Sequence, residues 1–265
     1  MSASGKWADL APRVATGVVM AIVGLGALWM GGAALKYLAS IVTGLMIWEL
    51  VNMTAGSGRK RLSPLLGLAT AAILFAAVLN HSSPRYLMLL AIPPLVTMAL
   101  AHRDRAYTLA YATAVLLTGY ALVAFREGYG LAWVLWVVLL VVVTDVMGYF
   151  GGRMIGGPKF WPRVSPKKTW SGTVAGWIGA ALVGFGFVIW AGAPAWLVAL
   201  SVLVAFASQL GDIAESAIKR RTGVKDSSNI LPGHGGVLDR FDGLIGAVTL
   251  LILWGFALPV PQFGG

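Results

Sequence analysis

The sequence SAIKRRTGVKDSSNILPGHGGVLDRFD, residues 216–242, connects two of the most apolar segments of the chain. Asp212 and Glu215 end the segment before it. The connection itself concentrates basic side chains, carboxylates, a histidine and glycines, namely Lys219, Arg220, Arg221, Lys225, Arg240, Asp226, Asp239, Asp242 and the run Gly233-His234-Gly235-Gly236. A membrane protein that concentrates this much charge in one connection is expected to carry out chemistry there. The stretch therefore predicts a membrane fold with a chemical site at the ends of its last helices.

The composition of the whole chain points to an integral membrane protein. Of its 265 residues 58% are hydrophobic and 11% charged, and the mean hydropathy is +0.81. Soluble domains carry roughly a quarter charged residues. A span needs ~20 apolar residues, so the chain has room for about eight to ten spans and no sizeable extramembrane domain. The absence of cysteine excludes disulfides and thiolate metal sites.

Apolar segments recur along the chain and predict about nine transmembrane helices. If the N-terminus is cytoplasmic, all 20 Lys and Arg residues except Lys36, Arg85 and Arg126 lie on the cytoplasmic side. We interpret the polar lead, residues 1–12, as a cytoplasmic tail, and the net charge of +10 as a result of topology rather than nucleic-acid binding. The predicted segments are 14–32, 36–53, 64–80, 86–101, 107–125, 131–152, 170–191, 195–217 and 241–259.

Four acids fall inside predicted spans: Glu49, Asp145, Asp212 and Glu215. A charge in hydrocarbon costs at least ~2.5 kcal/mol and usually marks a functional interior. In this topology each acid lies toward the cytoplasmic end of its helix. We therefore expect a carboxylate-lined cavity that is open to the cytosol. Glu49 is the weakest of the four, because a lone acid can pair with a neighbouring basic residue or with helix backbone.

The stretch 216–242 closely resembles the signature of the phosphatidate cytidylyltransferases. That signature reads S-x-aliphatic-K-R, four residues, K-D, a short spacer, H-G-G and D-R-x-D. The matching positions are Ser216, Lys219, Arg220, Lys225, Asp226, His234, Gly235, Gly236, Asp239, Arg240 and Asp242. The resemblance implies an enzyme of phospholipid biosynthesis, which transfers CMP from CTP to phosphatidate and releases pyrophosphate.

Two pairs of carboxylates have the spacing of one helix face. Asp212 and Glu215 share a face with Ser208, and such oxygens suit Mg²⁺, which takes one or two carboxylates plus substrate phosphates. Alternatively, Glu215 pairs with Lys219. Asp239 and Asp242 begin the last span, where either could instead serve as a helix cap.

The glycine-rich run at 233–236 could bring backbone N–H groups to a phosphate. The basic residues around it make a triphosphate cradle plausible, with His234 either donating to a phosphate or holding the loop. Ser165-Pro166-Lys167-Lys168-Thr169 precedes a span as ordinary helix-start and anchoring residues do, and it is also similar to an S-P-K-K-T element of the same family. The family further has an acidic, glycine-rich element where Asp145 lies.

These observations give one set of expectations. The fold is all-α and polytopic, with residues 1–130 as a scaffold of about five spans that could make dimer contacts, and 131–265 as the catalytic part. The partners are CTP, phosphatidate and membrane lipids, the cofactor is Mg²⁺ with room for a second metal or monovalent cation, and the location is a bacterial inner membrane with the site facing the cytoplasm. Candidate catalytic residues are Asp212, Asp239, Lys219 and Arg240; candidate metal ligands are Asp212, Asp239, Asp145, Asp242 and Glu215; candidate substrate ligands are Ser165, Lys167, Lys168, Thr169, Ser208, Arg220, Lys225, Asp226, His234, Gly235 and Gly236.

Other functions remain open at this point. A related CTP-dependent membrane enzyme, such as an ether-lipid cytidylyltransferase or a polyprenol kinase, would use the same chemistry. A transporter for an anionic solute is a rival from another class, although the one-sided clustering of charge argues against it. The CDP-alcohol phosphotransferases are disfavoured, because Asp242-Gly243 is not followed by their A-R pair. The histidines are too dispersed for a zinc site.

Overall fold

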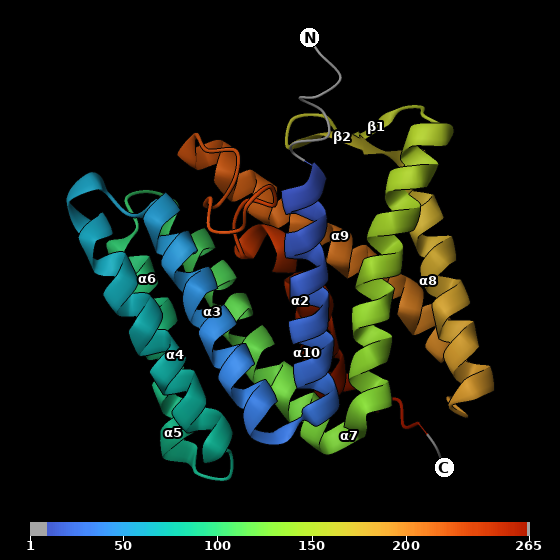
Figure 1. Ribbon diagram of the computed structural model, residues 1–265, viewed down its shortest axis with the longest axis horizontal. Helices are drawn as coiled ribbons and strands as arrows, with labels where there is room; N and C mark the ends of the chain where they lie inside the picture. Colours follow the sequence, from blue (N-terminus) through green and yellow to red (C-terminus); the bar gives the residue numbers. More distant parts are fainter. Residues whose placement is uncertain (1–9, 264–265) are drawn as a thin grey trace. The chain divides into compact units, whose positions relative to one another are not determined.

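The computed structural model describes residues 10–263, whose helices and strands are drawn in Figure 1. These residues form two compact units: the first contains residues 10–124 and 221–241, and the second contains residues 125–220 and 242–263. Most of the described chain is helical, which confirms the prediction of a mainly helical fold. The polar lead predicted to be a cytoplasmic tail lies largely outside the described residues.

The first unit begins with two helices, α2 (Leu10–Met30) and α3 (Gly32–Thr54), which meet at Gly31. Gly31 has a φ of 62°, a conformation that glycine adopts without strain and that breaks the helix here. The 3-10 turn η1 (Ser57–Leu62) leads into α4 (Ser63–Leu79), which runs beside α3 (Figure 1). Gly44 of α3 meets Gly67 of α4 so closely that a Cβ on Gly67 would lie 2.8 Å from the Gly44 oxygen. Small residues at such crossings let two membrane helices approach each other.

Three further helical segments complete the first unit: α5 (Pro84–Leu89), α6 (Ile92–Leu100) and the start of α7 (Arg105–Met154). The segment 221–241 is tied to this unit at its beginning. The Arg221 guanidinium lies 3.3 Å from the Asp104 carboxylate and stacks over the Tyr107 ring at 5.1 Å. The residues between α9 and α10, 223–237, form the signature loop. The contacts of Arg221 hold the start of this loop beside the start of α7.

The second unit consists of the rest of α7, a small sheet and three helices. Strands β1 (Lys159–Trp161) and β2 (Ser165–Thr169) pair antiparallel, with Lys159 opposite Thr169. The helices α8 (Trp170–Trp190), α9 (Leu197–Thr222) and α10 (Leu238–Ala257) follow, except that residues 221–222 of α9 and 238–241 of α10 belong to the first unit. Thr169 caps α8, because its hydroxyl accepts the Gly172 N–H at 3.2 Å. The helix start predicted after Thr169 is confirmed, whereas the strand before it corrects the expectation of an all-α fold.

Six helical segments within residues 10–263 are long and apolar enough to cross a membrane. One of them, α7, has 50 residues, or ~75 Å of helix, and departs from helical geometry at Gly130, where φ is 86°. It therefore contains two predicted spans, 107–125 and 131–152. The predicted span 86–101 is instead divided between α5 and α6, with Pro93 and Pro94 in the first turn of α6, where proline is tolerated. The structure thus supports an integral membrane protein without fixing the number of crossings at nine.

Candidate active site

In the first unit, the signature loop surrounds a polar cavity of about 480 Å³. The loop folds back on itself: Leu231 donates its N–H to Gly235, and His234 donates its own to Leu231, each at 2.9 Å. Gly233 and Gly235 have φ values of 74° and 85°, which other residues rarely adopt. The cavity is lined by Lys225, Asp226, Asn229, Leu231, Pro232, Gly233, His234, Gly235 and Arg240. Two cations and a glycine turn at one cavity are suited to an anionic ligand.

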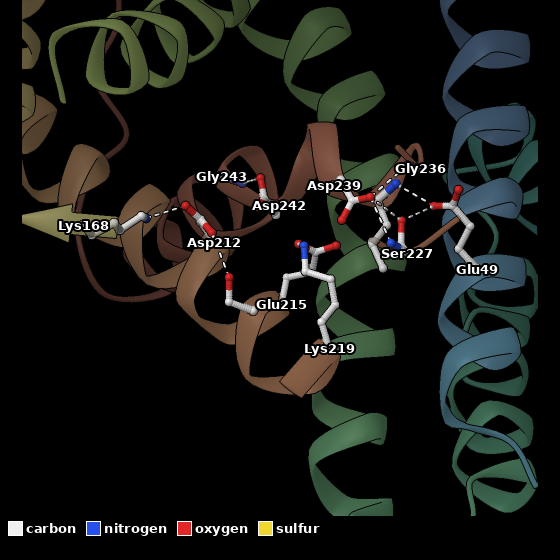
Figure 2. Close-up of polar contacts among 12 residues, drawn as sticks. Glu49, Lys168, Asp212, Glu215, Lys219, Ser227, Gly236, Asp239, Asp242 and Gly243 are labelled. Carbon is white, nitrogen blue, oxygen red and sulfur yellow. Dashed lines mark hydrogen bonds and ion pairs between the residues drawn. The ribbon is translucent and has the colours of Figure 1, made fainter. Parts of the chain in front are cut away.

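Two buried carboxylates hold the ends of this loop together (Figure 2). Oδ2 of Asp239 accepts the N–H groups of Ser227, at 2.9 Å, and Gly236, at 2.8 Å, and also the Ser227 hydroxyl. Glu49 of α3 accepts the Ser227 hydroxyl at 3.2 Å. Glu49 also accepts the N–H groups of Val237 and Leu238, at the start of α10. Hydrogen bonds to Asp239 and Glu49 therefore hold Ser227 close to residues 236–238. This junction is the base of the loop.

In the second unit, Asp212 of α9 lies at the centre of a cluster of polar side chains (Figure 2). Its Oδ2 is 2.5 Å from the Lys168 ammonium of β2, and its Oδ1 accepts the Ser216 hydroxyl at 3.2 Å. Lys168 also reaches the Gln209 carbonyl, at 3.4 Å. Strand β2 thus places Lys168 in contact with Asp212, which the sequence predicts to be a catalytic residue and metal ligand.

Two other acids of the second unit share this region. Asp242 interacts electrostatically with Asp212, Asp145 and Lys219, and its Oδ1 accepts the N–H of the following Gly243 at 2.7 Å. Ser208 is buried near Gly243, and no hydrogen-bond partner for its hydroxyl is present in the described part of the chain. Carboxylates from α7, α9 and α10 therefore come within electrostatic range of one another.

Glu215 is fully buried, and its Oε2 lies 2.5 Å from the Lys219 ammonium. This is the pairing that the sequence offered as the alternative to a metal role. The pair is drawn in Figure 2, one helical turn apart on α9. Because Lys219 also interacts electrostatically with Asp242, it joins the Glu215 pair to the carboxylates around Asp212.

The remaining predicted residues are divided between the two units. Lys225, Asp226, His234, Gly235 and Arg240 line the cavity of the first unit, and Gly236 donates its N–H to Asp239. Ser165, Lys167 and Thr169 lie on β2 of the second unit, with Lys167 exposed and Thr169 buried as a helix cap. Arg220 is exposed on α9, close to its end.

The donor chemistry of the second unit suits Mg²⁺, although the geometry is not that of a complete ion site. Mg²⁺ prefers oxygen ligands and usually binds one or two carboxylates plus substrate phosphates. Asp145, Asp212 and Asp242 supply such oxygens. Among residues 10–263, however, no three acidic or histidine side chains are grouped closely enough to hold an ion by themselves. Substrate phosphates would have to complete the coordination.

Sequence reasoning missed the way in which the loop is fastened. Glu49 was noted as a buried acid that could contact helix backbone, and Ser227 and Ser228 were not singled out. Both serines donate to Glu49, across separations of 178 and 179 residues. No local pattern reports a contact between such distant positions. The signal that the sequence does carry is Glu49 itself, the one acid within the predicted span 36–53.

The role of Asp239 in holding the loop can be tested through stability. We expect Asp239→Ala to lower the free energy of unfolding by about 2–4 kcal/mol, because it leaves the buried N–H groups of Ser227 and Gly236 without an acceptor. Asp239→Asn retains an oxygen that can take the Oδ2 position, so its loss should be about 1 kcal/mol. Denaturant titration of the purified protein in detergent measures both. Equal losses in the two variants would contradict the role of this acceptor.

Residues 11–257 match the model of the cytidylyltransferase family. This match covers nearly all of the described chain, including both units and the whole stretch 216–242. The chain therefore belongs to the cytidylyltransferase family.

Among the proteins to which the chain is similar are several named phosphatidate cytidylyltransferase. The chain is 35% identical over 263 residues to a phosphatidate cytidylyltransferase of Brucella abortus biovar 1 (strain 9-941), which covers 96% of each chain. It is 31% identical over 259 residues to the phosphatidate cytidylyltransferase of Staphylococcus haemolyticus (strain JCSC1435), covering 90% of this chain and 96% of the relative. The resemblance found in residues 216–242 thus extends over almost the full length.

Proposed function

We infer that the protein is a nucleotidyltransferase that transfers CMP from CTP to phosphatidate, giving CDP-diacylglycerol and pyrophosphate. The observation that carries this inference is the likeness, over almost the whole chain, to relatives named for this activity. The structure agrees with it chemically. An integral membrane chain can receive a lipid, and its signature loop surrounds a polar cavity that bears Lys225, His234 and Arg240.

The reaction needs little covalent help from the protein. An anionic oxygen of phosphatidate attacks the α-phosphorus of CTP, and the bond from that phosphorus to the bridging oxygen breaks as pyrophosphate leaves. The nucleophile is already charged, so no serine or cysteine has to be activated. The barrier comes from bringing anions together and from the charge on the leaving group, which positioned cations and N–H donors lower.

In our proposal the residues around the cavity of the first unit and those around Asp212 in the second unit have different tasks. Lys225 and Arg240, with His234 and the glycine turn, bind the triphosphate. Lys168, Lys219 and Arg220 neutralise charge on the reacting phosphates, and further candidate substrate ligands of the second unit are Ser165, Lys167, Thr169 and Ser208. We propose as candidate metal ligands Asp239 in the first unit and, separately, Asp212 in the second unit, where Asp145, Asp242 or Glu215 would support it. Mg²⁺, when bound, would offset the negative charge of the phosphates.

We also propose the finer features of the topology. Nine crossings with a cytoplasmic N-terminus leave only Lys36, Arg85 and Arg126 on the far side, as the positive-inside rule favours. The site then faces the cytoplasm of a bacterial inner membrane, where CTP is available. Residues 131–265 would supply the chemistry, whereas residues 1–130 would act as scaffold and could pair two copies.

The decisive assay is pyrophosphate release from CTP by the purified protein in detergent, with phosphatidate and Mg²⁺ each present or omitted. We expect release only when CTP, phosphatidate and Mg²⁺ are all present, with a CDP-lipid as the second product. Release with an ether lipid or a polyprenol in place of phosphatidate would assign a different acceptor. A folded protein that releases nothing with any of these lipids would overturn the enzymatic function and make anion transport the next function to assay.

A further inference from the structure

We propose that Glu49, on a helix remote in sequence from the signature, is a positioning residue for nucleotide binding. It would act by fixing the base of the loop that lines the polar cavity. This inference rests on the proposed function, because it assumes that the loop binds the triphosphate of CTP. Glu49 itself does not line the cavity.

The hydrogen bonds of Glu49 use both of its carboxylate oxygens. Oε1 accepts the Val237 N–H at 2.9 Å and the Ser228 hydroxyl at 2.5 Å. Oε2 accepts the Leu238 N–H at 2.6 Å and the Ser227 hydroxyl at 3.2 Å. Each oxygen thus binds one backbone N–H from the start of α10 and one hydroxyl from the other end of the loop. A single side chain joins the two ends.

Its surroundings make this arrangement costly to disturb. Glu49 is 0% exposed, so its oxygens have no water to replace a lost donor. The packing around it is tight: a Cβ added to Gly236 would overlap the Ser227 hydroxyl and lie 2.6 Å from Oε1 of Glu49. Hydrogen bonds to a carboxylate at a helix N-terminus are also among the stronger ones, because of its charge and the helix dipole. The loop base is therefore held in one arrangement.

Only a group with two accepting oxygens fits this pattern. Glutamine has the same length, but one of its terminal atoms is an NH₂ that can only donate. In either orientation that NH₂ would face a backbone N–H, of Val237 or of Leu238, and backbone donors cannot reverse as hydroxyls can. Glu49→Gln should therefore release one end of the loop while changing the side-chain volume very little.

The hydrogen bonds of Glu49 lie on both sides of the loop residues that line the cavity. The residues between the two fastened ends include Asn229, Leu231, Pro232 and His234, all of which line the cavity. Asp239 fastens the same ends through Ser227 and Gly236, so Glu49 and Asp239 hold the loop jointly. Loosening this base would let the lining residues spread over several conformations and would weaken binding before it affected the bond-making step.

The test compares Glu49→Gln with a control of similar instability elsewhere in the first unit. Leu74→Ala is the control: Leu74 is fully buried in α4, next to Gly119 of α7, and its truncation leaves a cavity remote from the loop in sequence. We expect Glu49→Gln to raise KM for CTP about tenfold, the effect of one lost interaction of ordinary strength, with kcat within threefold of wild type. Leu74→Ala should lower the melting temperature at least as much and leave KM for CTP within twofold.

Three results would overturn the proposal: an unchanged KM in folded Glu49→Gln, an equal rise of KM in Leu74→Ala, or a loss confined to kcat. If Glu49→Gln does not fold, Ser228→Ala takes its place, since it removes only one donor to Oε1, and we expect a rise of about threefold. An unchanged KM in Ser228→Ala would then count against the proposal. Failure of the proposed function is recognised separately, because wild type itself would not use CTP.

Discussion

Asp212→Asn is expected to lower kcat/KM for CTP by about a thousandfold, the upper end of the range seen when one preorganised group of an active site is removed. Asp212 pairs with Lys168 at 2.5 Å and interacts electrostatically with Asp242. Asparagine fits the same space and can still accept from Ser216, so the variant should fold. What it loses is the charge that holds Lys168 and that would attract a divalent cation. Initial rates of pyrophosphate release over a range of CTP concentrations measure the loss.

The matched control is Ser216→Ala, which removes the hydroxyl that donates to Oδ1 of Asp212 and leaves the charge in place. We expect it to lose less than about tenfold in kcat/KM, as for a single neutral hydrogen bond. A dependence on Mg²⁺ concentration that shifts in Asp212→Asn but not in Ser216→Ala would support a metal role. Asp212→Asn with kcat/KM within threefold of wild type would remove Asp212 from the reaction.

The sequence predicted the helices well because hydropathy is a local property. Each predicted span has helix in the structure, and Gly130 marks the break within α7 that the pattern placed between two spans. Prediction was poorer for the features of the fold that depend on tertiary packing. The division of 86–101 into α5 and α6 and the pairing of β1 with β2 depend on partners that no local pattern identifies.

The candidate site shows the same contrast. The signature residues could be found because they are close in sequence, and those around the glycine turn do line one cavity. The ion pair of Glu215 with Lys219 was foreseeable from their spacing of one helical turn. The contacts of Lys168 with Asp212 and of Glu49 with the loop were not foreseeable, because they join residues 44 to 189 positions apart.

Gly211→Ala should disable the protein through backbone packing. Gly211 of α9 faces Gly246 of α10, and a Cβ on Gly211 would lie 2.8 Å from the Gly246 nitrogen, 3.0 Å from its Cα, and against the carbonyl of Asp242. These are backbone atoms, so no rotamer change can make room and the helices must separate. Overpacking of this kind costs about 1–3 kcal/mol of stability.

Gly211→Ala should also lower activity in the molecules that remain folded, because Gly211 precedes Asp212 and its added Cβ would contact Asp242. Moving the two helices apart displaces both carboxylates together, and a shift of ~1 Å can cost about a hundredfold in rate. Gly186→Ala on α8 is the matched control: beyond its own stretch of helix, none of the residues 10–263 lies within 4 Å of its added Cβ, so it should keep wild-type activity and gain slightly in helix stability. Thermal unfolding and pyrophosphate release of the two variants decide the matter. If Gly211→Ala behaves like Gly186→Ala, then α9 and α10 do not meet as closely as described, and the grouping of Asp212 with Asp242 loses its structural basis.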